Sequence, residues 1–293
     1  MSLISETFRR LRAEKRGAFI PFVVLGDPDF NTSKKILEVL AKHADILELG
    51  FPFSDPIADG KRVQAADERA LKSGINTEKC FSLIRHVKRQ NKNVPVSLLL
   101  YYNLVYSNGT ENFLRKAKKA GVDAVLIADM PLEESKEFNR LCRKHGIEEV
   151  FIVAPTTGAK RMRSILSRVN GFVYIVGVLG VTGERKTLGK GGIGIALKIK
   201  KLSKIPACVG FGISNPGQAR KIISSGADGV IVGSALEAVI EKNLRNRKRL
   251  LREVERFAEK FKAAASGRET RKSAAGHKFK GAEGGRHGRR KRN

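Results

Sequence analysis

The sequence contains no tryptophan, only three cysteines and only five histidines, and these scarce residues exclude several kinds of protein. Cys80, Cys142 and Cys208 are odd in number and far apart, which argues against a disulfide framework and favours a reducing cytosol. The histidines and cysteines lack the spacing of a metal site, so no metal is expected. No apolar run approaches the roughly 20 residues that a membrane-spanning helix needs, so no contact with a membrane is expected.

The amino-terminal segment has no apolar stretch of the kind found in secretion signals. Leu3, Phe8 and Leu11 can share one face of a helix instead. We therefore expect a short amphipathic helix at the start of the chain.

Positive charge is in large excess, with 57 Lys and Arg against 29 Asp and Glu, a formal net charge of +28 that favours anionic partners. After Gly267 the chain holds ten Lys or Arg, two Glu and one Phe, which is too little apolar surface to form a core. We predict a disordered basic tail at 263–293 behind one folded domain at 1–262. Two interpretations of the tail stay open, a neutral extension and a non-specific contact with nucleic acid.

Eight short apolar runs recur along the chain, and segments with helical spacing lie between them. The runs are 18–26, 44–50, 94–102, 123–129, 150–155, 172–177, 206–212 and 229–233. They are apolar on both faces, which is typical of buried parallel strands. Eight such units in roughly 250 residues predict an α/β protein with a (β/α)8 TIM barrel. An open doubly wound sheet is the alternative, but no GxGxxG motif follows the first run.

A weak internal repeat supports stacked copies of one unit. The segments "KHADILELG", "AGVDAVLIAD" and "SGADGVIVGS" share a helix end, a small residue, an Asp and an apolar strand.

Two carboxylates are candidates for acid–base chemistry at the carboxyl ends of the predicted strands. Glu48 lies between Leu47 and Leu49, where burial would raise its pKa and suit it to give and take a proton near neutrality. Asp59 ends a loop that Pro52 and Pro56 stiffen. The alternatives are a buried ion pair for Glu48 and a simple turn residue for Asp59.

Glycine-rich segments mark a candidate anion site and a candidate lid. "GFGIS" at 210–214 and "GSA" at 233–235 each precede a helical pattern, and backbone N–H groups at helix N-termini bind phosphate. Barrels of this kind place such sites after strands 7 and 8. The segment 177–194 is predicted to be a long loop, which suits a lid over the site.

These segments together resemble the tryptophan synthase alpha subunit family. The resemblance covers roughly residues 1–262, with "GAFIPFVVLGDPD", "ADILELGFPFSDPIADG", "LLLYYNLVY", "GVDAVLIADMPLEES", "GVTG", "GFGIS" and "GADGVIVGSA" in family order. It departs from the family after "ADG", where Lys61 and Arg62 stand in place of a common proline.

The resemblance implies the cleavage of indole-3-glycerol phosphate to indole and glyceraldehyde 3-phosphate, with Glu48 as the acid/base and Asp59 on the indole N–H. The substrate-binding positions that it implies are Phe22, Leu99, Tyr174, Thr182, Gly183, Phe211, Gly212, Gly233 and Ser234. It further implies no cofactor in this subunit, and an α2β2 assembly with a beta subunit that holds pyridoxal phosphate.

Two other functions are compatible with parts of the sequence. Another phosphate-binding barrel, such as a sugar-phosphate isomerase or an aldolase, is one alternative, but an aldolase would need a strand-end lysine and the eight runs contain none. A barrel that binds nucleic acid through its tail is the other.

Overall fold

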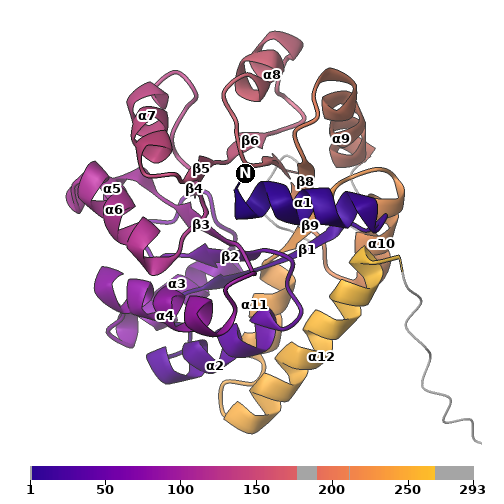
Figure 1. Cartoon of the computed structure of the whole chain (residues 1–293). Coiled ribbons are helices and arrows are strands. Elements are labelled where there is room, and N and C mark those ends of the chain that lie inside the picture. The colour runs from indigo at the N-terminus through magenta and orange to yellow at the C-terminus, as the bar shows by residue number, and fades with distance from the viewer. Residues whose placement is uncertain (1, 177–189, 211, 268–293) are drawn as a thin grey trace, which may run out of the picture.

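The computed structural model describes residues 2–176, 190–210 and 212–267, and in these ranges parallel strands form a barrel surrounded by helices (Figure 1). The strands are β1 (Ala18–Val24), β2 (Leu47–Gly50), β3 (Val96–Leu100), β4 (Ala124–Ile127), β5 (Glu148–Glu149), β6 (Phe151–Val153), β7 (Val173–Val176), β8 (Ala207–Gly210) and β9 (Gly229–Val232). Their order is β5-β4-β3-β2-β1-β9-β8-β7-β6, and all the pairings are parallel. The predicted barrel is confirmed.

Nine strands replace the predicted eight because a two-residue strand, β5, lies directly before the fifth predicted run. β5 pairs with β4, and β6 pairs with β7 on the other side. Val150 lies between them, and its N–H donates to the carbonyl of Val125 over 2.8 Å. The segment 148–153 therefore touches both ends of the strand order, and it brings the sheet round on itself.

The helices lie around the strands. They are α1 (Leu3–Ala13), α2 (Phe30–Ala41), α3 (Lys61–Lys72), α4 (Thr77–Gln90), α5 (Tyr102–Ser107), α6 (Thr110–Ala120), α7 (Lys136–Lys144), α8 (Ala159–Leu166), α9 (Lys190–Leu202), α10 (Pro216–Ser224), α11 (Ser234–Glu241) and α12 (Arg247–Ala265). Asn76 caps α4 through the N–H of Lys79, and Gly121 ends α6 with a φ of 97°. These are the start and stop signals expected of helices.

Helix α1 covers the amino-terminal end of the barrel (Figure 1). Phe8 and Leu11 are buried, and the ring of Phe8 contacts that of Phe172, which directly precedes β7. The predicted amphipathic helix is confirmed, although Ile4 is buried on this face and Leu3 is only partly buried. The opposite end of the barrel is left for the carboxyl ends of the strands.

The repeated Asp of the three similar segments has a structural role. Asp45 accepts the N–H of Phe19 over 2.9 Å, and Asp123 accepts that of Val96 over 2.9 Å. Asp228 accepts the N–H of Ala207 over 3.0 Å. Each carboxylate stands just before its own strand and binds the start of the neighbouring one. The repeat therefore sets strand pairing at the end of the barrel away from the candidate site.

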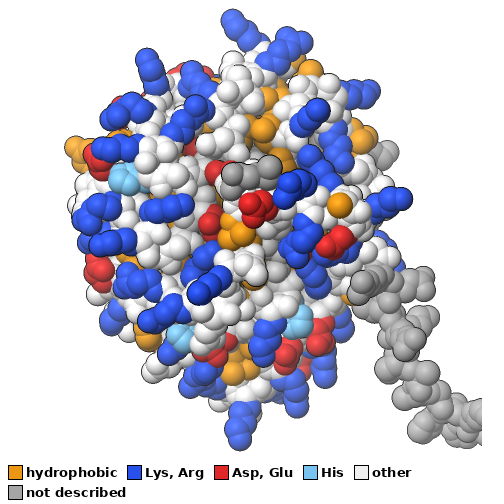
Figure 2. Space-filling model, in the orientation of Figure 1, with side chains coloured by type: hydrophobic (Ala, Val, Ile, Leu, Met, Phe, Trp, Pro, Cys, Tyr) orange, Lys and Arg blue, Asp and Glu red, His pale blue; other side chains and the backbone are white. Residues whose placement is uncertain are grey.

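The surface is basic over a wide area. In Figure 2 the Lys and Arg side chains are spread over the visible face and do not gather in one patch. No helix in the described ranges is long and apolar enough to cross a bilayer.

Two predicted segment boundaries differ from the structure. Helix α9 begins at Lys190, so residues 190–194 are helical and not part of a loop, while 177–189 lie outside the described residues. Helix α12 continues to Ala265, and the side chains of Ala264 and Ala265 are buried. The predicted tail lies outside the described residues from 268 onward.

Replacing Asp45 with Ala should lower the free energy of unfolding by about 2–4 kcal/mol, because it removes the acceptor of a buried N–H and the partner of Lys262. Asp45→Asn should cost less, since it keeps an acceptor oxygen. Urea unfolding measures both, and Asp55→Ala on an exposed loop is the control. Losses for Asp45→Ala no larger than for the control would contradict the strand-pairing role.

Candidate active site

The strand register brings predicted site residues together at one end of the barrel. Phe22 of β1 pairs with Glu48 of β2, and Gly50 pairs with Leu99 of β3. Because side chains alternate along a strand, Phe22 and Glu48 point to the same side of the sheet, into the barrel. Tyr174 of β7 packs against Gly210 of β8 and lies near Glu48, and burial first, then the charge of Glu48, raise its pKa well above the usual value.

Glu48 is a fully buried carboxyl group without a hydrogen-bond partner in the described part of the chain. Its exposed fraction is 0%, and neither carboxyl oxygen has a partner there. Its pKa is raised to about 8, mainly by burial and to a smaller extent by the nearby charge of Asp59. No Lys or Arg of the described residues pairs with it, which contradicts the alternative of a buried ion pair. Glu48 is therefore mostly protonated at neutral pH and close to its titration point.

Asp59 is held by a residue that the sequence analysis did not single out for the site. The hydroxyl of Tyr101 donates to Asp59 Oδ2 over 2.8 Å and accepts the N–H of Ala58 over 3.0 Å. Phe53 stacks on Tyr101 with ring centroids 5.0 Å apart and planes 16° apart. Burial raises the pKa of Asp59, and the Tyr101 hydrogen bond opposes that rise. The position of Tyr101 at the end of the third apolar run was the available signal.

A second carboxyl that the sequence analysis missed is Asp67 of α3. It is 4% exposed, and burial first, then the charge of Asp59, raise its pKa to about 8. Its carboxyl lies close to the backbone of Phe53 in the Asp59 loop, and this contact opposes part of the rise in its pKa. The signal lies in the helical pattern, since Asp67 stands on the buried stripe of Val63, Ala66 and Ala70.

Glycines make room for the aromatic rings of the site. A Cβ on Gly50 would lie 2.8 Å from the Phe22 ring, and one on Gly233 would also lie 2.8 Å from it. A Cβ on Gly210 would overlap the hydroxyl of Tyr174. Larger residues at these three positions would displace rings that line the interior beside Glu48.

The candidate anion site is only partly described. Gly212 has a φ of +69°, which favours glycine, and a Cβ there would meet open space. Gly233 caps α11 and Ser234 is its first residue, so N–H groups of the first turn of α11 are available for an anion. Thr182, Gly183 and Phe211 lie outside the described residues.

No group of His, Cys, Asp and Glu in residues 2–176, 190–210 and 212–267 could hold a metal ion.

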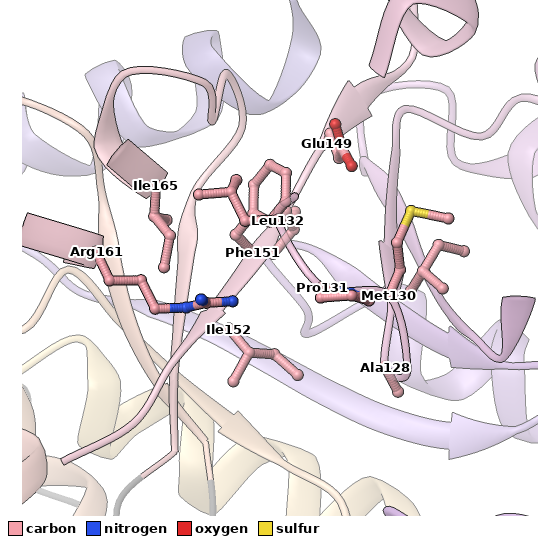
Figure 3. Close-up of a pocket in the computed structure, with 11 residues that line it drawn as sticks. Ala128, Met130, Pro131, Leu132, Glu149, Phe151, Ile152, Arg161 and Ile165 are labelled. Atoms are coloured by element: carbon pink, nitrogen blue, oxygen red, sulfur yellow. The ribbon is translucent and has the colours of Figure 1, made fainter. Parts of the chain in front are cut away.

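A separate cavity of about 80 Å³ lies between β4, β6 and α8 (Figure 3). Most of the residues that line it are apolar, and none of them is a predicted site residue. Arg161 points into it, but its guanidinium is bound to Glu133 over 2.9 and 3.0 Å. Burial raises the pKa of Glu149 at its edge to about 7, and Asn139 donates to that carboxyl over 2.5 Å. These polar groups already have partners, so the cavity offers no comparable chemistry.

The family model described as tryptophan synthase alpha chain matches residues 8–266. The tryptophan synthase alpha chain of Methanothermobacter thermautotrophicus is 48% identical over 261 residues, which cover 89% of this chain and 95% of the relative. The solved tryptophan synthase subunit alpha of Legionella pneumophila is 32% identical with a TM-score of 0.83, covering 91% of this chain and 99% of that chain. A chain in a structure of the mutually activating tryptophan synthase a2b2 complex of Pyrococcus furiosus is 36% identical with a TM-score of 0.78. The match covers 84% of this chain and 98% of that chain.

The titration of Glu48 predicts a distinct pH dependence of stability. Its pKa rises from 4.5 to about 8 on folding, so the folded state binds the proton more tightly. The stability that this provides is complete below pH 4.5 and is lost as the pH rises to 8. Glu48→Gln removes the titration, so its stability relative to wild type should increase by about 1.4 kcal/mol per pH unit in that window. Urea unfolding at pH 5, 6 and 7 measures the difference, and a difference that stays constant would contradict the raised pKa.

Proposed function

Because the chain belongs to the tryptophan synthase alpha chain family, we propose that it cleaves indole-3-glycerol phosphate to indole and glyceraldehyde 3-phosphate. This is a carbon–carbon lyase reaction of tryptophan biosynthesis. The observation that carries the proposal is Glu48, a buried and unpartnered carboxyl whose pKa of about 8 suits both donation and acceptance of a proton.

In the proposed reaction the Glu48 carboxyl gives its proton to C3 of the indole ring. The ring becomes a cation, and the Asp59 carboxylate, hydrogen-bonded to the ring N–H, stabilises that charge. The Glu48 carboxylate then takes the proton of the hydroxyl on the carbon attached to C3. The bond between this carbon and C3 breaks, its electrons return to the ring, and the carbon becomes the aldehyde. Glu48 ends the cycle protonated, as it began.

The remaining predicted residues would bind the substrate. Phe22, Leu99 and Phe211 are proposed to line the indole pocket, with Tyr174 beside Glu48. Residues proposed to hold the phosphate are Gly183, Gly212, Gly233 and Ser234. Thr182 is proposed to bind Asp59 when the lid closes. The first turn of α11 supports the phosphate assignment, because its dipole and free N–H groups attract an anion.

The chain is further proposed to act in the cytosol, in an α2β2 assembly with a beta subunit. The solved a2b2 complex of Pyrococcus furiosus supports this partner. The pyridoxal phosphate is proposed to lie in the beta subunit, with no cofactor in this chain. Ile57, 82% exposed in the loop that carries Asp59, suits a contact with the partner, because a large exposed apolar side chain loses hydration there.

Glu48→Gln should reduce the release of indole from indole-3-glycerol phosphate by about 10²–10⁴-fold, because Gln keeps the shape but cannot transfer the proton. The assay uses wild type and variant with the cognate beta subunit present. No indole from folded wild-type protein in the complex would overturn the lyase proposal. Equal rates for both proteins would remove Glu48 from the acid/base role.

Tyr101→Phe should lower kcat/KM for the same reaction by about tenfold, because Asp59 and the N–H of Ala58 each lose a hydrogen bond. The Phe ring keeps the stacking on Phe53, so folding should be retained. Tyr106→Phe is the matched control, since Tyr106 is 68% exposed. An unchanged kcat/KM in Tyr101→Phe would show that Asp59 does not need this contact.

A further inference from the structure

Three ionisable side chains from separate elements meet beside the carboxyl end of β1. Asp27 follows β1, Arg69 belongs to α3 and Glu237 belongs to α11. Arg69 Nε and Nη2 donate to the two carboxyl oxygens of Asp27 over 2.7 and 2.9 Å. Glu237 Oε1 accepts the N–H of Val24 over 3.0 Å, and Glu237 Oε2 has no hydrogen-bond partner in the described part of the chain. The carboxyls of Asp27 and Glu237 lie close enough for each to shift the pKa of the other. Asp27 is 1% exposed and Glu237 is 0% exposed.

The position of the proton in this cluster follows from burial and charge. Burial raises the pKa of Glu237 well above its usual value, and the neighbouring Asp27 raises it further. Burial also raises the pKa of Asp27, but the two hydrogen bonds from Arg69 oppose that rise. These directions favour a protonated Glu237 beside an Asp27 carboxylate whose charge balances that of Arg69. The fork-shaped ion pair fixes the geometry of Asp27 and Arg69, and the hydrogen bond from Val24 holds Glu237 beside them.

The cluster joins the two halves of the candidate site. Helix α11, which carries Glu237, begins at Ser234 in the proposed phosphate site. Helix α3, which carries Arg69, begins at Lys61, two residues after Asp59.

Helix α3 also reaches Asp59 through a second set of contacts. The Asp67 carboxyl lies close to the backbone of Phe53, Phe53 stacks on Tyr101, and Tyr101 donates to Asp59. Buried and half-buried contacts thus lead from the helix at the proposed phosphate site towards Asp59.

We propose that Arg69, Asp27 and Glu237 are positioning residues that couple phosphate binding at α11 to the placement of Asp59 against the indole ring. The proposal rests on the proposed function, because it uses the same phosphate and indole sites. An anion bound at the N-terminus of α11 favours one position of that helix. Because Glu237, Asp27 and Arg69 link α11 to α3, the position of α3 changes with that of α11. A packed network with one favoured arrangement can carry such coupling between sites.

The test measures indole binding to the full chain with and without saturating inorganic phosphate. Because the protein has no tryptophan, the fluorescence of indole reports its binding directly. In wild type, phosphate should lower the dissociation constant of indole by about tenfold, within the usual range of coupling between sites. No effect of phosphate in wild type would overturn the proposal.

The variants separate coupling from simple structural support. Glu237→Gln keeps the shape of the side chain and can still accept from Val24, so it should keep the phosphate effect. Glu237→Met should abolish the effect while the affinity for phosphate alone, measured by calorimetry, stays near the wild-type value. Arg69→Lys, which loses the forked contact but keeps the charge, gives a second route if Glu237→Met does not fold. Glu137→Gln, in an exposed ion pair with Arg140 on α7, is the control and should behave as wild type.

A double-mutant cycle with Asp59→Asn identifies the end of the coupling path. Asp59→Asn should abolish the phosphate effect, and adding Glu237→Met should change it no further. Retention of the wild-type effect in Glu237→Met or Arg69→Lys would overturn the coupling role. If wild-type protein releases indole from indole-3-glycerol phosphate but phosphate does not change its affinity for indole, only this proposal is overturned. Wild type without lyase activity would instead overturn the proposed function.

Discussion

The dry interior of the closed barrel is the constraint on which the proposed chemistry depends. A carboxyl that faces inward from β2 loses its hydration, and no described cation replaces the lost water. Glu48 therefore keeps its proton at neutral pH, with a pKa of about 8. The segment 148–153, which joins the two ends of the strand order, thus contributes to the burial of Glu48 as well as to the fold.

Several carboxyls near this end of the barrel have different environments, and so different states. Glu48 has no partner, while Asp59 is held by Tyr101 in a half-buried loop. Asp67 lies beside that loop with its own raised pKa, and burial and Asp27 raise the pKa of Glu237. Burial favours the neutral form, and the hydrogen bonds from Tyr101 and Arg69 oppose that effect at Asp59 and Asp27. The carboxyls also raise one another's pKa, as Asp59 does for Glu48 and Asp67, so the protonation of each depends on its neighbours.

The two ends of the barrel divide stability from chemistry. Asp45, Asp123 and Asp228 bind the starts of neighbouring strands, and α1 covers this end. These carboxylates have cationic partners, such as Lys262 for Asp45 and Lys88 for Asp123. At the other end Glu48 has none. The Asp that recurs in the three similar segments therefore stabilises strand pairing, whereas Glu48, which does not recur, lies in the candidate site.

The sequence by itself predicted the barrel, the approximate positions of eight strands and the two candidate carboxylates, because buried parallel strands have a local apolar signature and turn residues bound them. It did not reveal Tyr101 as the partner of Asp59, Asp67 beside the loop, or the cluster of Asp27, Arg69 and Glu237. Those assignments join elements up to about 210 residues apart, and no local pattern encodes which side chains meet across such a separation. Only the tertiary structure decided that Glu48 lacks a partner among the described residues. A partner could come from any element packed around Glu48, so its absence follows only from the positions of all of them.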